Sequence, residues 1–96
     1  MARAKKIFCI VAYDINDDKN RGKVAKILET NGVRINYSVF ECMLTISQLN
    51  KIKDRISVCV NGKTDTVVYY QICVNCFTKT EYLPEKRKIY NSIQIV

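Results

Sequence analysis

Asp14 is the residue whose type and position best suit metal chemistry. It follows an apolar run at residues 7–13 and directly precedes an acidic turn at residues 15–18. A carboxylate at the end of a buried strand reaches a cleft from a fixed backbone, and its hard oxygen atoms suit magnesium. One carboxylate holds magnesium poorly, so we expect two copies of Asp14, related by a two-fold axis, to form a bridging pair. The alternative is that Asp14 only stabilises the turn, and Asp17 and Asp18 are expected to cap a helix.

Basic side chains follow this turn. The whole chain has 16 Lys and Arg against 9 Asp and Glu, a formal net charge of +7. A small surface with this charge concentrates polyanions, and arginine supplies forked donors that suit a phosphate. The pattern predicts a nucleic-acid-binding surface made by Arg21, Lys23, Lys26 and Arg34. The alternative, strongest for Lys26, is a helix face that is charged only for solubility.

Other chemistry is excluded or left incomplete by the sequence. The chain contains no histidine, which excludes a histidine-based general base, a catalytic triad and a zinc-histidine site. Cys73 and Cys76 form half of a structural zinc site, but no second pair has a suitable spacing. A dimer that joins two pairs is one alternative and a redox pair is another. The pattern favours inert thiols buried at the end of a strand.

The cysteines and the first residues indicate the compartment. The chain has five cysteines, an odd number, and its basic opening is followed by an apolar run that ends in the acidic turn rather than at a small-residue cleavage site. That run is also too short to cross a bilayer. We therefore expect a cytoplasmic protein with reduced thiols and no membrane partner.

The hydrophobic pattern predicts the elements that must position these residues. Residues 6–13 are apolar on both faces, which predicts a central strand, and the next segment has apolar residues at helical spacing up to Asn31-Gly32. That pair tolerates a left-handed backbone and is expected to close the helix. Residues 34–44 alternate with a period of two, which predicts a hairpin or a kinked strand. A capping box at residues 45–48 then begins a second helix, and residues 66–74 suit another strand.

This order of elements predicts an α+β fold, the ferredoxin-like (βαββαβ) sandwich, with both helices on one face of an antiparallel sheet. Residues 1–78 would form this domain. Residues 79–96 remain as an extension, with a strand-like start in TKTEYL at 78–83, a basic break at 84–88 and a terminal run at 89–96. We expect the extension to add a C-terminal strand to the sheet edge of a partner protomer, which would give a homodimer.

One segment carries a resemblance to a known family. The sequence AYDINDDKNRGKVAKILETNGVRINYSVFECMLT, residues 12–45, contains a strand ending in Tyr-Asp, an acidic turn, an Arg/Lys helix, and a Tyr-Ser-Val-Phe-Glu-Cys strand. It resembles the CRISPR-associated Cas-two family, the small partner in spacer acquisition, and the resemblance covers about residues 6–77. The resemblance implies a ferredoxin-like homodimer whose C-terminal strand crosses to the partner.

The resemblance also implies roles for particular residues. The family's proposed magnesium ligand is an Asp at the end of the first strand, which is Asp14 here. Lys23 stands where some members carry Arg, which keeps the charge but loses the forked donor. Family positions implicated in nuclease activity fall on Tyr13, Arg21, Arg34 and Phe40.

Two functions follow from the resemblance. One is a magnesium-dependent endonuclease that cleaves RNA or double-stranded DNA. The other is a non-catalytic scaffold that bridges two dimers of the CRISPR integrase (Cas-one) and supports a double-stranded DNA prespacer by phosphate contacts. A single carboxylate per chain is sparse for phosphodiester cleavage, so the sequence favours the scaffold role as essential and leaves catalysis open. A virulence-associated-toxin-like ribonuclease shares the fold, but the Tyr-Ser-Val-Phe segment argues against it.

Overall fold

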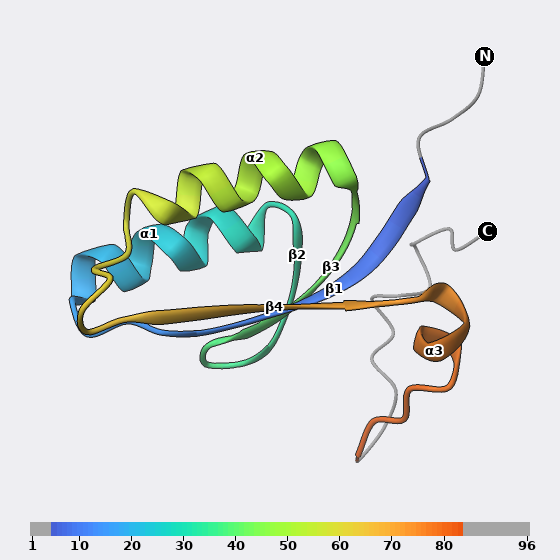
Figure 1. Ribbon diagram of the computed structural model, residues 1–96. Helices are drawn as coiled ribbons and strands as arrows, with labels where there is room; N and C mark the ends of the chain where they lie inside the picture. The colour runs from blue at the N-terminus through green and yellow to red at the C-terminus, as the bar shows by residue number, and fades with distance from the viewer. Residues whose placement is uncertain (1–4, 84–96) are drawn as a thin grey trace.

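A computed structural model describes residues 5–83, in which two helices lie side by side over one face of a four-stranded antiparallel sheet (Figure 1). The strand order is β2-β3-β1-β4, so β1 lies inside the sheet between β3 and β4. The predicted ferredoxin-like order of elements is confirmed. The elements are β1 (Lys6–Asp14), α1 (Asp18–Glu29), β2 (Gly32–Asn36), β3 (Val39–Thr45), α2 (Ile46–Ser57), β4 (Thr66–Ile72) and α3 (Val74–Thr78).

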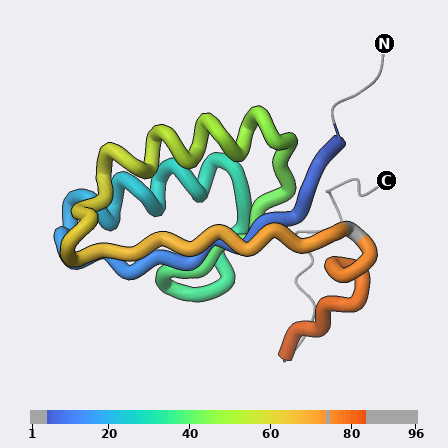
Figure 2. Tube along the Cα trace, in the orientation of Figure 1, coloured from blue at the N-terminus to red at the C-terminus, as the bar shows by residue number. Residues whose placement is uncertain are grey.

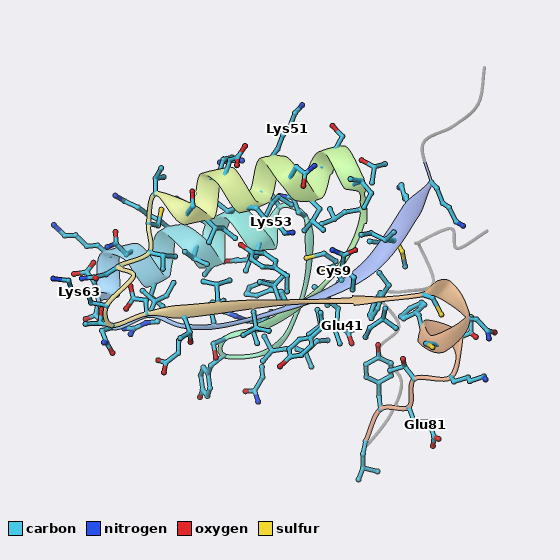
Figure 3. All side chains as sticks on the ribbon, viewed as in Figure 1. Cys9, Glu41, Lys51, Lys53, Lys63 and Glu81 are labelled. Atoms are coloured by element: carbon cyan, nitrogen blue, oxygen red, sulfur yellow. The ribbon has the colours of Figure 1, made fainter. Side chains whose placement is uncertain are left out.

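Alternation along β1 divides its side chains between two faces of the sheet. Cys9, Val11 and Tyr13 belong to the main core beneath α1 and α2, whereas Phe8 and Ile10 belong to a smaller cluster on the other face. We call that second face, which α1 and α2 leave uncovered, the open face. Figure 3 shows Cys9 and Glu41 on opposite sides of the sheet, in agreement with this division.

Both long helices begin at the caps that the sequence predicts. The Asp17 carboxylate accepts a hydrogen bond of 2.9 Å from the Asn20 N–H at the start of α1. At α2, the Thr45 hydroxyl accepts from the Gln48 N–H at 3.1 Å and the Gln48 side chain accepts from the Thr45 N–H at 2.9 Å. This reciprocal pair satisfies two of the backbone donors that a helix start leaves free. Each long helix therefore begins with a hydrogen-bonded cap made by residues close to it in the chain.

Gly32 has a different role from the predicted one. The α1 cap is Thr30, and Gly32 is the first residue of β2, opposite Cys42 of β3, without a left-handed backbone. A Cβ atom at this position would lie 2.5 Å from the Cys42 Sγ and closer still to the carbonyl oxygen of Glu41. Glycine is therefore required by close approach of two strands rather than by a turn. Tyr37, predicted to alternate within a strand, lies in the β2–β3 turn and is 89% exposed.

The segment after β4 departs from the prediction. Instead of ending in buried thiols, β4 is followed by the short helix α3, and both Cys73 and Cys76 are exposed. Within one chain, α3 ends at Thr78 and residues 79–83 form no strand, so the predicted pairing of a strand-like start at 78–83 with a partner stays a prediction. The tube in Figure 2 passes from β4 into this helical turn. The predicted basic break at 84–88 and terminal run at 89–96 lie outside the described residues.

The helices are short and amphipathic. Within residues 5–83, none of them is both long enough and apolar enough to cross a membrane.

Candidate metal and phosphate site

Asp14 lies where the sequence places it, at the last position of β1, with an exposed side chain. It pairs in register with Thr66, the first residue of β4. Alternation along β1 assigns Asp14 to the open face, together with Ile10 and Ala12. Its carboxylate is therefore on the side of the sheet that α1 and α2 do not cover.

The turn after Asp14 is hydrogen-bonded to the loop before β4. The Asn16 N–H donates to the Asp65 carboxylate at 3.0 Å, and the Asn16 side-chain amide donates to the Thr64 carbonyl oxygen at 3.2 Å. The second oxygen of Asp65 accepts from the Asn61 N–H at 2.9 Å. Asp65 thus fixes the backbone that follows Asp14. Sequence reasoning missed this residue, whose one signal is its place in the Asn-Gly-Lys-Thr-Asp turn.

These hydrogen bonds set the charge state of Asp65. The backbone N–H of Asn16 and that of Asn61 lower the pKa of its carboxyl group, with a smaller effect from the Thr64 hydroxyl. Asp65 is 7% exposed, and its carboxylate oxygens accept hydrogen bonds from Asn16, Asn61 and Thr64. A lowered pKa means that the carboxylate stabilises the fold above its ordinary pKa of about 3.9, and that this contribution is lost as the pH falls through the folded value.

Asp65→Asn is expected to destabilise the protein at pH 7, because the neutral amide offers one acceptor oxygen where two oxygens accept now. The difference from wild type should shrink as the pH falls below about 3.9, where the wild-type carboxylate also becomes protonated. Urea unfolding across this pH range measures it, with the exposed Asp54→Asn as the matched control. A difference that is independent of pH would contradict the assignment.

Tyr13, Phe40 and Arg34 form a stack on the helix-facing side of the sheet. The Tyr13 and Phe40 rings are 6.3 Å apart between centroids, and the Arg34 guanidinium carbon is 5.2 Å from the Phe40 ring centroid. The Tyr13 hydroxyl donates to the Tyr37 carbonyl oxygen at 3.3 Å. Both rings are buried. Within one chain the sheet therefore separates this stack from Asp14, although the sequence groups them as one site.

Arg21 connects α1 to the turn after β1. Its guanidinium donates to the Ile15 carbonyl oxygen at 3.0 Å and pairs with the Asp18 carboxylate. The side chain stays partly exposed, so its charge remains accessible from solvent. Arg21 is thus a positioning residue for the turn as well as a cation near Asp14.

Lys23 and Lys26 lie together at a groove between the two long helices. The groove is lined by these lysines and Ile27 of α1, by Thr30 just after it, by Arg55 of α2 and by Cys59 just after that helix. Arg55 is the residue here that sequence reasoning missed, because its place beside α1 depends on how the helices pack. Three cations from two helices therefore flank one groove.

The donor chemistry at Asp14 fits magnesium, since a carboxylate is a hard oxygen ligand and this one is exposed. Among residues 5–83, no three His, Cys, Asp or Glu side chains gather as a metal-binding group. One protomer thus offers a single carboxylate, and a complete site needs donors from a second copy or from a phosphate.

The chain is similar in sequence to proteins of one family. The family model described as CRISPR associated protein Cas2 matches residues 7–80. A Synechocystis protein named CRISPR-associated endoribonuclease Cas2 3 is 36% identical over 72 residues, which is 75% of this chain and 78% of the relative. The CRISPR-associated endoribonuclease Cas2 of Thermus thermophilus is 36% identical over 66 residues, 69% of this chain and 70% of that one.

Solved structures agree with this match. The crystal structure of Streptococcus pyogenes Cas2 at pH 6.5 superposes with a TM-score of 0.71 and 32% identity, and the match covers 79% of this chain and 98% of that chain. A hypothetical protein from Thermus thermophilus gives a TM-score of 0.68 and 35% identity, over 71% of this chain and 83% of that one. With its strand order, its acidic turn after β1 and these matches in sequence and fold, the chain belongs to the CRISPR associated protein Cas2 family.

Proposed function

We propose that this protein acts in the cytoplasm as a two-fold homodimer that binds nucleic-acid phosphates during CRISPR spacer acquisition. In this role it bridges two dimers of the CRISPR integrase (Cas-one) and supports a double-stranded DNA prespacer. The observation that carries the proposal is the groove flanked by Lys23, Lys26 and Arg55. Membership of the Cas2 family supplies the CRISPR context.

The cations of the groove suit a phosphate backbone. Among residues 5–83, none of the three is paired with an acidic side chain, whereas Arg21 is paired with Asp18. Lysine and arginine that are free of internal partners can exchange their counterions for phosphates, which is the main source of sequence-independent affinity for a duplex. The neighbouring lining residues Ile27 and Thr30 give no pattern for reading base edges.

The open face of the sheet supports the homodimer. Val68 and Tyr70 of β4 are 41% and 54% exposed there, beside the half-buried Ile10 of β1. A second copy seated on this face would remove apolar surface from water, which is the main driving force for association. Both copies of Asp14 would then lie on the faces that meet at the interface. The pairing of residues 79–96 with the partner's sheet stays a prediction.

Duplex binding should depend steeply on salt. If ~6 phosphates are neutralised, three by each protomer, log K against log salt should fall with a slope near ~ −5. The variant Lys23→Gln/Lys26→Gln/Arg55→Gln should lose most of this slope in fluorescence anisotropy with a labelled duplex.

The control variant Lys5→Gln/Lys51→Gln/Lys63→Gln removes the same charge from exposed positions away from the groove (Figure 3 labels Lys51 and Lys63). It should keep most of the slope, since only the overall potential changes. A flat salt dependence in wild type, or equal losses in the two variants, would refute binding through the groove. Sedimentation in the same buffers should give a dimer.

A second candidate function is a magnesium-dependent endonuclease acting on RNA or double-stranded DNA. The relatives named as endoribonucleases and the exposed Asp14 favour it. In the proposed dimer the two Asp14 carboxylates would hold the ion, and Arg21 keeps the turn beside them in place while its charge attracts phosphate. Bound there, magnesium would polarise a phosphate and activate water. Tyr13, Phe40 and Arg34 act on the other side of the sheet, where they support the strand that carries Asp14.

A further inference from the structure

The five cysteines fall into two groups that differ in access to solvent. Cys9, Cys42 and Cys59 are buried in the main core, and burial raises the pKa of Cys42 to about 12. Cys73 and Cys76 are exposed, at the junction of β4 and α3. Reagents in solution can therefore reach one pair of thiols, and neither the proposed phosphate groove nor Asp14 uses that pair.

The two exposed sulfur atoms lie on one turn of the backbone. The Cys73 Sγ accepts a hydrogen bond of 3.3 Å from the Cys76 N–H. The Phe77 N–H donates to the Cys73 carbonyl oxygen at 2.9 Å and closes the same turn. Residues three apart in such a turn share a face, so the two thiols lie on the same side of it.

The turn is anchored to the sheet. The Phe77 ring packs on the Phe8 ring of β1, with centroids 4.1 Å apart, and both side chains are buried. Further along, the Tyr82 hydroxyl donates to the Glu41 carboxylate of β3 at 2.8 Å. The backbone that carries the two cysteines is therefore anchored to the sheet by aromatic packing at Phe77.

The same contacts make the two thiols unequal. The pKa of Cys73 is lowered first by the backbone N–H of Cys76, then by the Cys76 thiol, with smaller help from the Asn75 N–H and the charge of Lys79. The pKa of Cys76 is raised by its hydrogen bond to Cys73 and by the charge there. Cys73 is therefore the more readily ionised thiol of the pair and Cys76 the less readily ionised one.

We propose that Cys73 and Cys76 form a redox-active dithiol that low-molecular-weight disulfides, such as glutathione disulfide, convert to an intramolecular disulfide. The Cys73 thiolate attacks one sulfur of glutathione disulfide, forms a mixed disulfide and releases one glutathione thiolate. Cys76 then loses its proton to solvent and attacks the Cys73 Sγ, which releases the second glutathione thiolate. The protein loses two electrons and two protons, and one glutathione disulfide becomes two glutathione molecules.

Mass spectrometry after equilibration in glutathione buffers of graded ratio tests the proposal on the full chain. Wild type should lose the mass of two hydrogen atoms on oxidation, and alkylation of the free thiols followed by peptide mapping should place the disulfide between Cys73 and Cys76. Cys76→Ser should stop at the mixed disulfide, with one glutathione on Cys73. Cys73→Ser should form no disulfide within one chain, because Cys76 then has no second exposed thiol to pair with, and any glutathione should stay on Cys76 as a mixed disulfide.

Cys59→Ser is the matched control, since it removes a buried thiol and should leave the oxidation unchanged. Both exposed positions tolerate serine without a cavity, so these variants should keep the wild-type circular dichroism spectrum. Free thiols at Cys73 and Cys76 throughout the oxidising range would overturn the proposal. Disulfides only between chains would also overturn it, and so would Zn²⁺ binding by the reduced pair that withstands glutathione disulfide.

Discussion

Asp14→Asn should abolish magnesium-dependent cleavage of RNA and of duplex DNA while duplex binding persists. The substitution keeps the shape of the side chain at the end of β1 but removes the negative charge from both copies in the proposed dimer. Loss of groups that merely orient a metal ligand costs up to ~100-fold in metal affinity or activity, so loss of the ligand itself should cost at least that much. Phosphate binding should be equal or slightly tighter, since two negative charges are lost per dimer.

Cleavage of labelled substrates with magnesium and with chelator measures the first effect, and salt-dependent anisotropy measures the second. Asp54→Asn, an exposed carboxylate on α2, is the control for charge alone and should cleave like wild type. Cleavage retained by Asp14→Asn would refute the proposal that Asp14 is the magnesium ligand. If spacer acquisition is lost while dimer and duplex binding are intact, catalysis rather than scaffolding is the essential function.

Of the three glycines, Gly22, Gly32 and Gly62, we expect replacement by alanine to destabilise the protein most at Gly32. The new Cβ would lie 2.5 Å from the Cys42 Sγ and closer still to the Glu41 carbonyl oxygen, in the pairing of β2 with β3. The carbonyl belongs to the backbone of a strand inside the sheet and cannot turn away. We expect a loss of about 3 kcal/mol in the free energy of unfolding, and a fall in Tm on the order of 10–20 °C.

Gly22→Ala is the matched control, because it adds the same methyl group where nothing lies within 4 Å. Gly22 is inside α1, so alanine there should stabilise the protein by about 0.5–1 kcal/mol. Thermal and urea unfolding at one fixed protein concentration measure both variants, since the stability of a dimer depends on concentration. Equal stability of Gly32→Ala and wild type would show that β2 and β3 can separate at this point.

The sequence alone determined the order of the strands and the two long helices, and the residues at which those helices begin. The apolar run of β1, the helical spacing in α1 and the capping groups Asp17 and Thr45 act between residues that are close in the chain, so pattern and chemistry sufficed to place them. It also identified Asp14 at the end of the first strand. The net charge of +7 and the basic residues after the acidic turn were enough to indicate phosphate binding, because charge is a property of composition rather than of packing.

Packing between distant segments decided the rest. Arg55 joins Lys23 and Lys26 only because α1 and α2 lie side by side, and Asp65 reaches Asn16 across 49 positions of the chain. Such contacts depend on the sheet order, which local periodicity does not encode. Gly32 also depends on packing between strands, because a side chain at this position would collide with β3.

The tertiary structure also decided which residues lie on the same face of the sheet and which thiols are exposed to solvent. The sheet places Asp14 on the open face and the Tyr13–Phe40 stack under the helices. The residues that the sequence suggested as one site therefore lie on opposite faces of the sheet in one chain. A buried strand end was predicted for Cys73 and Cys76, yet the packing of Phe77 on Phe8 turns the chain into α3 and leaves both sulfur atoms outside. The apolar side chain, rather than the cysteines, takes the available place on the sheet, because burying a ring removes more apolar surface from water than burying a thiol.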